Sequence, residues 1–359
     1  MLKVGVDISK TKLIQNINGV INCGGKVVQF YMGPKISWSK GNPLAPNDIK
    51  KINELRISHG LMPFVHSKLI INLCHIDNND AVNSLIYDLT AANEFGADVV
   101  VHQGKNVSEL GLNRIDAINA YVNNIKKVLD ATPGLTNHIL LENSCQQGSE
   151  LGYTIEELST IWSLFDESYK DRLGFCIDLC HIHVAGTMNV SDHQSVIDTF
   201  QEFHKLIGLQ HIRLIHFNDS NIPFGKKNDC HEDILVGHIG NSLLGGSSNG
   251  FKQIIKFAIE YQIPLLLETP NNIPYNNQIN LLLSWENIPI NTISTYEQKY
   301  IEQFKARIEE FGNNPISRKG NKKQAHCNTN APKLSIPVIN DNNILPTKKK
   351  ILILKKKNN

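Results

Sequence analysis

Acidic and histidine residues close six successive apolar runs of the chain. They are His66, His102, Glu142, Asp178, His216 and Glu268. One such residue after a strand is usually a helix cap or a hydrogen-bonded turn residue, but six in succession favour a shared site. Imidazoles and carboxylates gathered in one place would repel one another or stay unsatisfied without cations. Tetrahedral zinc takes three or four ligands, so three histidines and three acids imply at least two metal ions.

A second group of candidate ligands follows on the loops beyond these run ends. His181 stands three residues after Asp178 in GFCIDLCHIHVAG, and Asp229 and His231 stand two apart in NDCHEDI. Alternate residues of an extended chain point the same way, so this loop can direct Asp229 and His231 toward one point. With His181 they form a His/Asp/His set that suits a third metal ion with open positions. The other histidines have no such setting, and we interpret them as ordinary helix or loop residues.

Eight apolar runs supply the strands that must position these side chains. They span 2–7, 26–32, 61–66, 97–103, 138–143, 173–178, 212–219 and 264–269. Amphipathic segments of helical period lie between most of them, at 47–60, 78–96, 113–131, 154–165, 192–208 and 250–262. Strand and helix repeated eight times over about 270 residues predict an α/β fold, the (β/α)8 TIM barrel, whose strand ends open on one face. A doubly wound sheet also alternates in this way, but it would place its site at a single crevice.

The composition of the chain changes near its C-terminal end. A closing amphipathic helix is expected over about 290–311. From Asn313 onward the chain has 11 Lys and Arg residues and one acid, which leaves 25 basic and 33 acidic residues before it. We therefore expect a catalytic barrel domain over 1–312 and a disordered, low-complexity Lys/Asn-rich tail over 313–359. Such a tail can add phosphate contacts or serve as a nuclear address.

The remaining composition indicates the compartment. The seven cysteines are odd in number and show no disulfide or zinc-knuckle spacing, which fits reduced thiols in an intracellular protein of the nucleus or cytoplasm. No run approaches the ~18 apolar residues of a membrane span, so we expect no membrane partner. We expect the protein to act as a monomer.

Seven stretches of the chain resemble the endonuclease IV type of apurinic/apyrimidinic endonuclease. They are FVHSKLIINL (64–73), VVVHQG (99–104), ILLENSCQQGSELG (139–152), GFCIDLCHIHVAG (174–186), IHFNDS (215–220), NDCHEDI (228–234) and PLLLETP (264–270). The resemblance covers roughly residues 1–290 and includes all eight expected strands. It is therefore specific to the barrel and does not extend to the tail.

This resemblance implies a site that holds three zinc ions in each chain. By similarity, His66, His102 and Glu142 bind the first zinc ion. Glu142 bridges to the second, which Asp178, His216 and Glu268 also hold. His181, Asp229 and His231 bind the third. Glu142, as the bridging ligand, is the implied catalytic residue.

The resemblance also implies the reaction and the substrate. The substrate is double-stranded DNA with abasic sites, cleaved at the phosphodiester 5′ to the lesion. The products are a 3′-hydroxyl and a 5′-deoxyribose phosphate, and blocked 3′ ends are trimmed as well. These steps belong to the repair of damaged DNA by base excision.

Contacts to DNA are expected from loops at the mouth of the barrel. Leu69 and Ile70 stand where the family places residues that wedge into DNA, although an aromatic residue is common at the first of these positions. Asp7 is a second departure, because the family often has His there. The lysines that we expect to contact phosphates are Lys35, Lys68, Lys105, Lys226 and Lys227.

Two other functions are compatible with a barrel of this kind. A sugar isomerase or epimerase also lines its strand ends with Glu, Asp and His around one or two metals, and the fold cannot decide between them. The Asp229 and His231 pair favours a third metal and hence cleavage of a phosphodiester. A catalytically inactive DNA-binding barrel is the other alternative, but it would have no use for nine candidate ligands.

Overall fold

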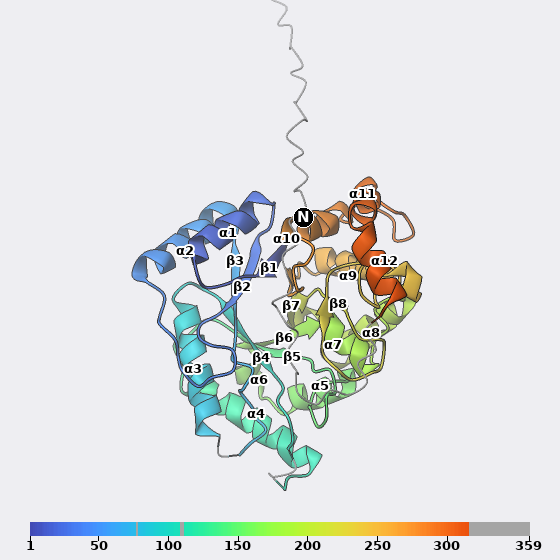
Figure 1. Ribbon diagram of the computed structural model, residues 1–359. Helices are drawn as coiled ribbons and strands as arrows, with labels where there is room; N and C mark the ends of the chain where they lie inside the picture. The colour runs from blue at the N-terminus through green and yellow to red at the C-terminus, as the bar shows by residue number, and fades with distance from the viewer. Residues whose placement is uncertain (77, 108–110, 316–359) are drawn as a thin grey trace, which may run out of the picture.

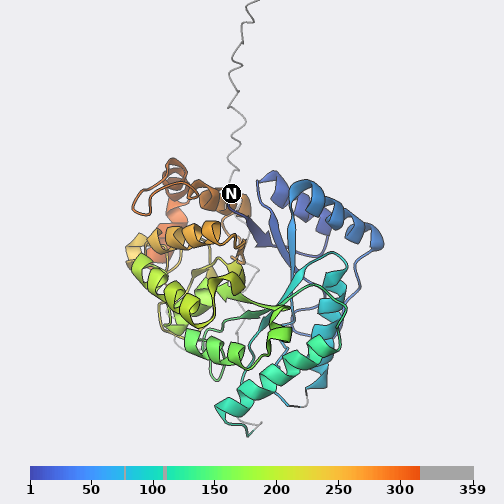
Figure 2. The same cartoon turned by 180° about the vertical axis from the view of Figure 1, so that it is seen from behind.

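The chain folds into a closed barrel of eight parallel strands, as predicted (Figures 1 and 2). The computed structural model describes residues 1–76, 78–107 and 111–315. The strands are β1 (Val4–Asp7), β2 (Val27–Tyr31), β3 (Met62–His66), β4 (Asp98–His102), β5 (Ile139–Glu142), β6 (Leu173–Asp178), β7 (Ile212–His216) and β10 (Leu265–Leu267). Each strand pairs in parallel with its two neighbours, and β10 closes the ring against β1. The doubly wound alternative is therefore excluded.

Helices surround the barrel and connect its strands. The long ones are α1 (Leu13–Asn22), α2 (Pro46–His59), α3 (Asn79–Asn93), α4 (Arg114–Asp130), α5 (Ile155–Ser163), α8 (His193–Leu206), α9 (Asn249–Glu260) and α10 (Tyr275–Ser284). Shorter ones are α6 (Glu167–Lys170) and α7 (Leu179–Ala185), and a two-stranded hairpin joins β8 (Asp219–Ser220) to β9 (His231–Glu232). The six predicted helices are present within a few residues of their expected ends. The sequence pattern did not reveal α1, α6, α7 and α10.

The interior of the barrel is filled by one ring of apolar side chains. Its members are Val27, Phe64, Val100, Leu140, Cys176, Leu214 and Leu266. Residues between these positions point outward and pack under the helices, as Val65, Val101 and Phe175 do. This double burial is the reason that the strands read as continuous apolar runs.

Polar residues form the next layer toward the carboxyl ends of the strands. Side chains alternate along a strand, so the residue two places after each member of the apolar ring faces inward again. These residues are Gln29, His66, His102, Glu142, Asp178, His216 and Glu268. The six chemically active residues of the sequence pattern therefore line one mouth because they share one phase of the strand repeat.

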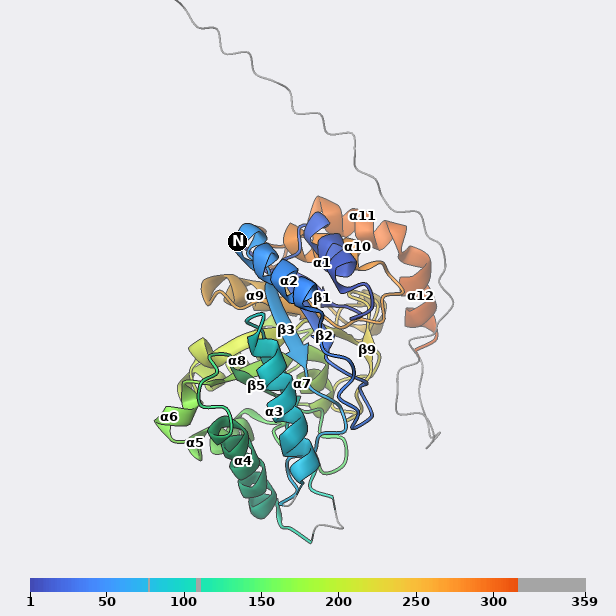
Figure 3. The same ribbon diagram turned by 90° about the vertical axis from the view of Figure 1, so that its left-hand side faces the viewer.

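The C-terminal region differs from its prediction. Two helices, α11 (Thr295–Gln303) and α12 (Lys305–Asn313), replace the single helix expected over 290–311. A capping box between Ser294 and Glu297 starts α11 there, and the buried Phe304 separates the two helices. In Figure 3 the helix α10 lies beside α1, and α10 also contacts α11 and β1.

The predicted tail lies almost wholly outside the described residues, which end at 315. Its disorder and the domain boundary at 312 therefore stay predictions. None of the described helices combines the length and apolar character that crossing a bilayer requires.

A buried ion pair fastens α9 to α11. Lys252 Nζ lies 2.9 Å from Glu297 Oε2, and both side chains are almost fully buried. Glu297 also accepts hydrogen bonds from Trp285 Nε1 at 2.9 Å and from Ser248 Oγ at 2.8 Å. Its carboxylate therefore satisfies donors from the start of α9 and from the end of α10.

We expect Glu297→Ala to destabilise the barrel, because it leaves the Lys252 ammonium buried without its partner. The loss should be about 3–5 kcal/mol in the free energy of unfolding. Urea titration followed by circular dichroism measures it, with the exposed Glu309→Ala in α12 as the matched control. A loss no larger than that of the control would show that the pair contributes little.

Candidate metal centre and its family

Glu142 lies at the centre of the mouth and divides its two carboxylate oxygens between two sets of residues. Its Oε2 faces His66 Nε2 at 3.3 Å and His102 Nε2 at 3.1 Å. Its Oε1 faces His216 Nδ1 at 2.9 Å. Glu142 is only 1% exposed, so the charge sits in a water-poor place between imidazoles. This is the arrangement that a bridging carboxylate needs.

The residues around Glu142 form two groups of potential ligand atoms. The first group is His66, His102 and Glu142, and the second group is Glu142, Asp178, His216 and Glu268. In the second group His216 Nδ1 lies 3.1 Å from Glu268 Oε2 and 3.7 Å from Asp178 Oδ2. The ligand atoms within each group lie within 4.8 Å of one another, which is close enough for one cation to contact them all.

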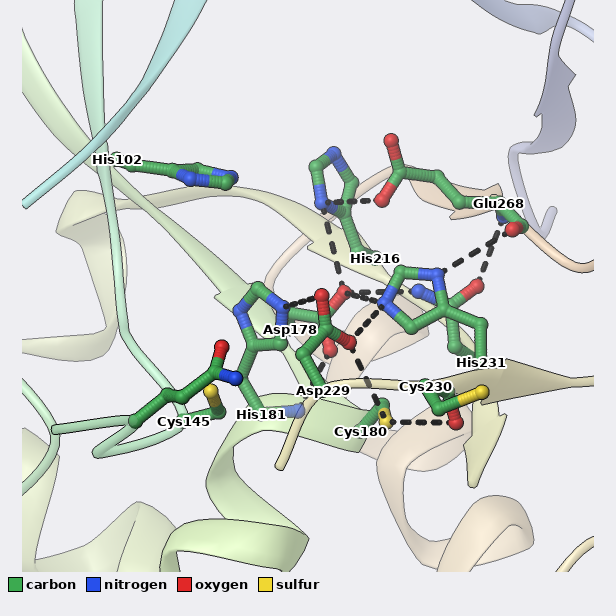
Figure 4. A network of polar contacts seen from close by, with 12 residues as sticks. His102, Cys145, Asp178, Cys180, His181, His216, Asp229, Cys230, His231 and Glu268 are labelled. Carbon is green, nitrogen blue, oxygen red and sulfur yellow. Dashed lines mark hydrogen bonds and ion pairs between the residues drawn. The ribbon is translucent and has the colours of Figure 1, made fainter. Parts of the chain in front are cut away.

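A third group lies beside these two, as the loop spacing predicted. Its members are His181, Asp229 and His231. The ligand atoms of the two histidines also converge with that of Asp178, and those of Asp229 and His231 converge with that of Cys180. Asp229 stands between the two imidazoles, with Oδ2 at 3.5 Å from His181 Nε2 and Oδ1 at 3.2 Å from His231 Nε2 (Figure 4). His231 Nε2 also lies 3.6 Å from Asp178 Oδ2, so the third group adjoins the second. All nine candidate ligands therefore meet in one mouth.

The start of α7 explains the spacing of Asp178 and His181. Asp178 ends β6 and caps α7, because its Oδ1 accepts a hydrogen bond from the backbone N–H of His181 at 2.8 Å. The cap fixes His181 in the first turn of a fully buried helix. Gly186 ends the same helix at φ 85°, a conformation that favours glycine. The β8–β9 hairpin then brings Asp229 and His231 over this helix.

Backbone carbonyls orient three of the histidines through contacts to their Nδ1 atoms. The Nδ1 atoms of His66, His181 and His231 lie 2.8, 2.9 and 3.3 Å from the carbonyl oxygens of Ser67, Asn143 and Glu268, respectively. An Nδ1–H that donates to a carbonyl leaves Nε2 free as a lone-pair donor toward the centre of the mouth. The tautomers are thus set for binding a cation.

Two buried asparagines that the sequence reading missed brace the carboxylates. Asn143 Oδ1 accepts from the backbone N–H of Asp178 at 2.7 Å. Asn218 Nδ2 donates to Asp178 Oδ2 at 2.8 Å, and Asn218 Oδ1 accepts from the backbone N–H of Glu268 at 2.8 Å. Asn143 directly follows Glu142 and Asn218 follows His216 by two residues, but no local pattern of the sequence reveals these contacts.

Histidines and carboxylates in the mouth stabilise each other's charged forms. Burial disfavours the imidazolium form, but Asp178 and Asp229 outweigh it and raise the pKa of His181 well above its usual value. The same two aspartates raise the pKa of His231 to about 9, again against burial. Burial opposes the charged carboxylate of Glu142 as well, yet His102 and other neighbouring histidines hold its pKa well below its usual value. Positively charged imidazoles and negatively charged carboxylates therefore lie next to one another in the mouth.

Two thiols near the groups were not among the predicted ligands. Cys176 lies within reach of Glu142 and His216, and Cys180 lies within reach of the third group. Burial raises the pKa of Cys176 to about 12 and that of Cys180 well above its usual value. A metal ion that binds either sulfur must first displace the thiol proton, because the thiolate is the binding form. The nine residues stay the predicted ligand set.

A cavity of about 360 Å³ opens beside the first and third groups. His102, Glu142, His181 and Asp229 form its inner end. Its walls include Leu69, Ile70, Asn72, Val107, Ser144 and Gln147. The two predicted wedge residues therefore lie at this cavity, and a small polar group can enter it toward the candidate ligands.

The lysines predicted to bind phosphates differ in their exposure and in their contacts. Lys35 Nζ lies 4.1 Å from the centre of the Tyr31 ring, which itself stacks on His66, and 3.8 Å from Asp7 Oδ2. Lys35 is thus half exposed at the rim of the mouth. Lys68 was wrongly placed on the surface, since it is only 3% exposed.

The remaining three lysines lie at the surface. Lys105 pairs with Glu150 at 3.1 Å, which reduces its availability to phosphates. Lys226 and Lys227 are exposed. Together with Lys35, these two are the better candidates for contacts to an anionic partner.

Uptake of a divalent cation by this mouth should release protons near neutral pH. The imidazoles of His181 and His231 have raised pKa values, so a cation must displace their protons to reach the ring nitrogens. We therefore expect affinity to increase as the pH rises from neutral toward about 9, the pKa of His231. Calorimetry of zinc binding in buffers of different ionisation enthalpy counts the protons. A count of zero at neutral pH would contradict this charge pattern.

Comparisons with known proteins place the chain in a family. The xylose isomerase-like TIM barrel family matches residues 20–285. A protein of Acanthamoeba polyphaga mimivirus that carries the name endonuclease 4 is 37% identical over 281 residues, which cover 74% of this chain and 86% of that protein. A protein of the same name from Clostridium beijerinckii is 32% identical over 292 residues, which cover 79% of this chain and 99% of that protein.

Solved structures agree on the fold. Endonuclease IV from Thermus thermophilus superposes with a TM-score of 0.65 at 22% identity and covers 79% of this chain and 98% of its own. A D-tagatose 3-epimerase-like protein superposes with a TM-score of 0.54 at 19% identity and covers 87% of this chain and 99% of its own. At these identities the two structures bear on the fold alone, whereas the sequence relatives bear on the family. The chain belongs to the endonuclease 4 family of xylose isomerase-like TIM barrels.

Proposed function

We propose that this protein is a zinc-dependent DNA repair endonuclease that cleaves the phosphodiester 5′ to abasic sites in double-stranded DNA. The proposed products are a 3′-hydroxyl and a 5′-deoxyribose phosphate, with trimming of blocked 3′ ends. The observation that carries the proposal is that nine potential ligands converge in one mouth, with Glu142 between the first two groups and Asp229 between His181 and His231. Relatives that carry the name endonuclease 4 support the same reaction class.

The side chains of the mouth suit zinc. Glu142 Oε2 and His231 Nε2 are buried atoms that make no hydrogen bond among the described residues, and both face the ligand groups. Imidazole and carboxylate are ordinary zinc ligands, and three or four surround each ion. When bound, zinc lowers the pKa of a water toward about 7, holds a phosphate and stabilises charge on a leaving oxygen. All nine ligands come from one chain, which supports action as a monomer.

Glu142 is the residue that we assign to catalysis. Its carboxylate stays charged, as its lowered pKa indicates, and its two oxygens face different groups. It can therefore hold the first and second groups at a fixed separation while a phosphate is attacked. No separate side-chain base is required beside it.

Selection of abasic DNA would follow from the cavity and its rim. A nucleotide without a base lacks stacking and pairing, so its extrusion costs less than flipping an intact nucleotide. The cavity beside the ligand groups admits a small sugar, and Leu69 and Ile70 at its wall can wedge into the duplex. Lys35 at the rim can contact a phosphate, although its ion pair with Asp7 must then open. A DNA substrate supports action inside the cell, in the nucleus or the cytoplasm.

Removing the wedge should weaken substrate binding more than turnover. We expect the double substitution Leu69→Ala and Ile70→Ala to raise the KM for abasic duplex about tenfold, since it forfeits apolar contacts worth roughly 1–3 kcal/mol. Steady-state cleavage of a fluorescent abasic duplex measures KM and kcat separately. Ile57→Ala is the matched control, because Ile57 is an equally apolar side chain, 90% exposed, on α2. An unchanged KM would remove Leu69 and Ile70 from the DNA interface.

A sugar isomerase or epimerase remains the second candidate. The similarity to a D-tagatose 3-epimerase-like protein supports the shared barrel only. The third group argues against this function, because one or two metals suffice for such enzymes. An epimerase would hold at most two metals and leave abasic DNA intact.

A cleavage assay tests the proposed function directly. The purified full chain is incubated with a duplex that carries one abasic site and with the intact duplex. We expect a single nick 5′ to the lesion, a 3′ end that a polymerase extends, and loss of both after chelation. Intact abasic duplex at high enzyme concentration with added zinc would reject the proposal.

A further inference from the structure

Gln29 is the residue that β2 contributes to the polar layer. The other members of this layer are candidate ligands. Gln29 stands two residues after Val27 of the apolar ring, as His66 stands two residues after Phe64. Its side chain is fully buried. A buried amide at the mouth needs partners for both its oxygen and its nitrogen. The contacts of this amide therefore reveal its role.

The Gln29 amide joins two members of the second group. Its Oε1 accepts a hydrogen bond from His216 Nε2 at 3.0 Å. Its Nε2 donates to Glu268 Oε1 at 2.7 Å. The opposite atoms of the same two residues, His216 Nδ1 and Glu268 Oε2, face each other at 3.1 Å. The Gln29 amide thus binds His216 Nε2 and Glu268 Oε1, while His216 Nδ1 and Glu268 Oε2 are left facing each other.

We propose that Gln29 is a positioning residue that fixes His216 and Glu268 for the second metal of the mouth. This inference rests on the proposed function, since it requires that the second group binds a cation. An Nε2–H that donates to the amide oxygen leaves Nδ1 as the ligand atom of His216. The donor bond to Glu268 Oε1 leaves Oε2 as the ligand oxygen. Residues that brace metal ligands in this way typically contribute 10- to 100-fold in affinity, so a loss of about that size is expected.

An amide suits this position better than an acid or an apolar side chain. It offers an acceptor to the imidazole and a donor to the carboxylate at the same time. Asp7, the last residue of β1, is the register partner of Gln29 in the neighbouring strand. A carboxylate in place of the amide could still accept from His216 but would face two other acids, Glu268 and Asp7. Gln29 therefore joins the ends of β7 and β10.

Two substitutions separate these roles. Gln29→Met keeps the volume and removes both hydrogen bonds. Gln29→Glu keeps an acceptor for His216 and removes the donor to Glu268. The matched control is Gln253→Met, the same exchange at a buried glutamine of α9 on the outside of the barrel. Circular dichroism checks the fold of each variant, and Gln29→Glu carries the test if Gln29→Met does not fold.

Zinc binding is measured by competition with a chelator, and the His216 ring by ¹⁵N NMR of the zinc-loaded chain. For Gln29→Met we expect about 10- to 100-fold weaker retention of one zinc ion and unchanged retention of the others. The signature of a hydrogen-bonded Nε2–H on His216 should vanish in Gln29→Met and persist in Gln29→Glu. Gln253→Met should match the wild type in both readouts.

Different results would overturn this inference and the proposed function. A wild-type chain that binds zinc beside a Gln29→Met variant with the same binding curve and His216 signal would overturn the role of Gln29 alone. Equal losses in Gln29→Met and Gln253→Met would do the same, because they would reflect general loosening. A wild-type chain that binds no divalent metal would overturn both.

Discussion

Replacing Glu142 by Gln should reduce cleavage of abasic DNA by about 1,000-fold or more, a loss on the scale of a missing charge-stabilising group. The carboxylate faces the first group through Oε2 and the second group through Oε1, so its neutral amide weakens two groups at once. The pKa of Glu142 is held well below its usual value, so the wild-type residue is charged throughout the working pH range. The amide cannot supply that charge.

The measurement is single-turnover cleavage of an abasic duplex at saturating enzyme. The matched control is Glu260→Gln at the exposed end of α9, which makes the same exchange outside the barrel. Thermal unfolding of both variants shows whether the fold survives. Near-normal cleavage by Glu142→Gln would contradict the assignment of this residue as the bridge.

Replacing Asp229 by Asn should remove one metal ion and most of the activity. Asp229 lies between His181 and His231, and both imidazoles hold its pKa well below its usual value. An asparagine leaves two imidazoles without the anion between them. We expect zinc content to fall by one ion per chain and cleavage to fall by about 100-fold or more, as for the loss of one charge-stabilising contact.

Zinc content and cleavage are measured on the same preparation of Asp229→Asn. Asp192→Asn is a matched control, because Asp192 caps α8 by a side-chain bond that an asparagine can also make. If Asp229→Asn kept both its zinc and its activity, the third group would have no part in the reaction.

The sequence was most informative where one physical repeat controlled many residues. Burial on both faces made the strands readable as apolar runs, and the alternation of side chains brought the six strand-end residues to one mouth. Gln29 belongs to the same layer but was missed, because the apolar run at 26–32 continues past it to Met32 and hides the inward position. Counting two residues on from Val27, the member of the apolar ring in this strand, would have identified Gln29 as facing inward.

Features that depend on three-dimensional packing were not readable in this way. Lys68 follows His66 in a loop and was predicted to be exposed, but the chain folds over it and buries it. The bracing roles of Asn143 and Asn218 depend on contacts with β6 and with Glu268 that no local pattern encodes. The break between α11 and α12 at the buried Phe304 has the same origin. Long-range contacts decided each of these cases.

Elemental analysis of the purified full chain tests the central claim, which is that the mouth holds a cluster of metal ions. We predict about three zinc ions per chain, the number that three groups of three to four ligands can hold. Chelation should remove the zinc together with cleavage of abasic DNA, and added zinc should restore both. A chain that carries no divalent metal, or that cleaves abasic DNA equally well after complete chelation, would contradict the account.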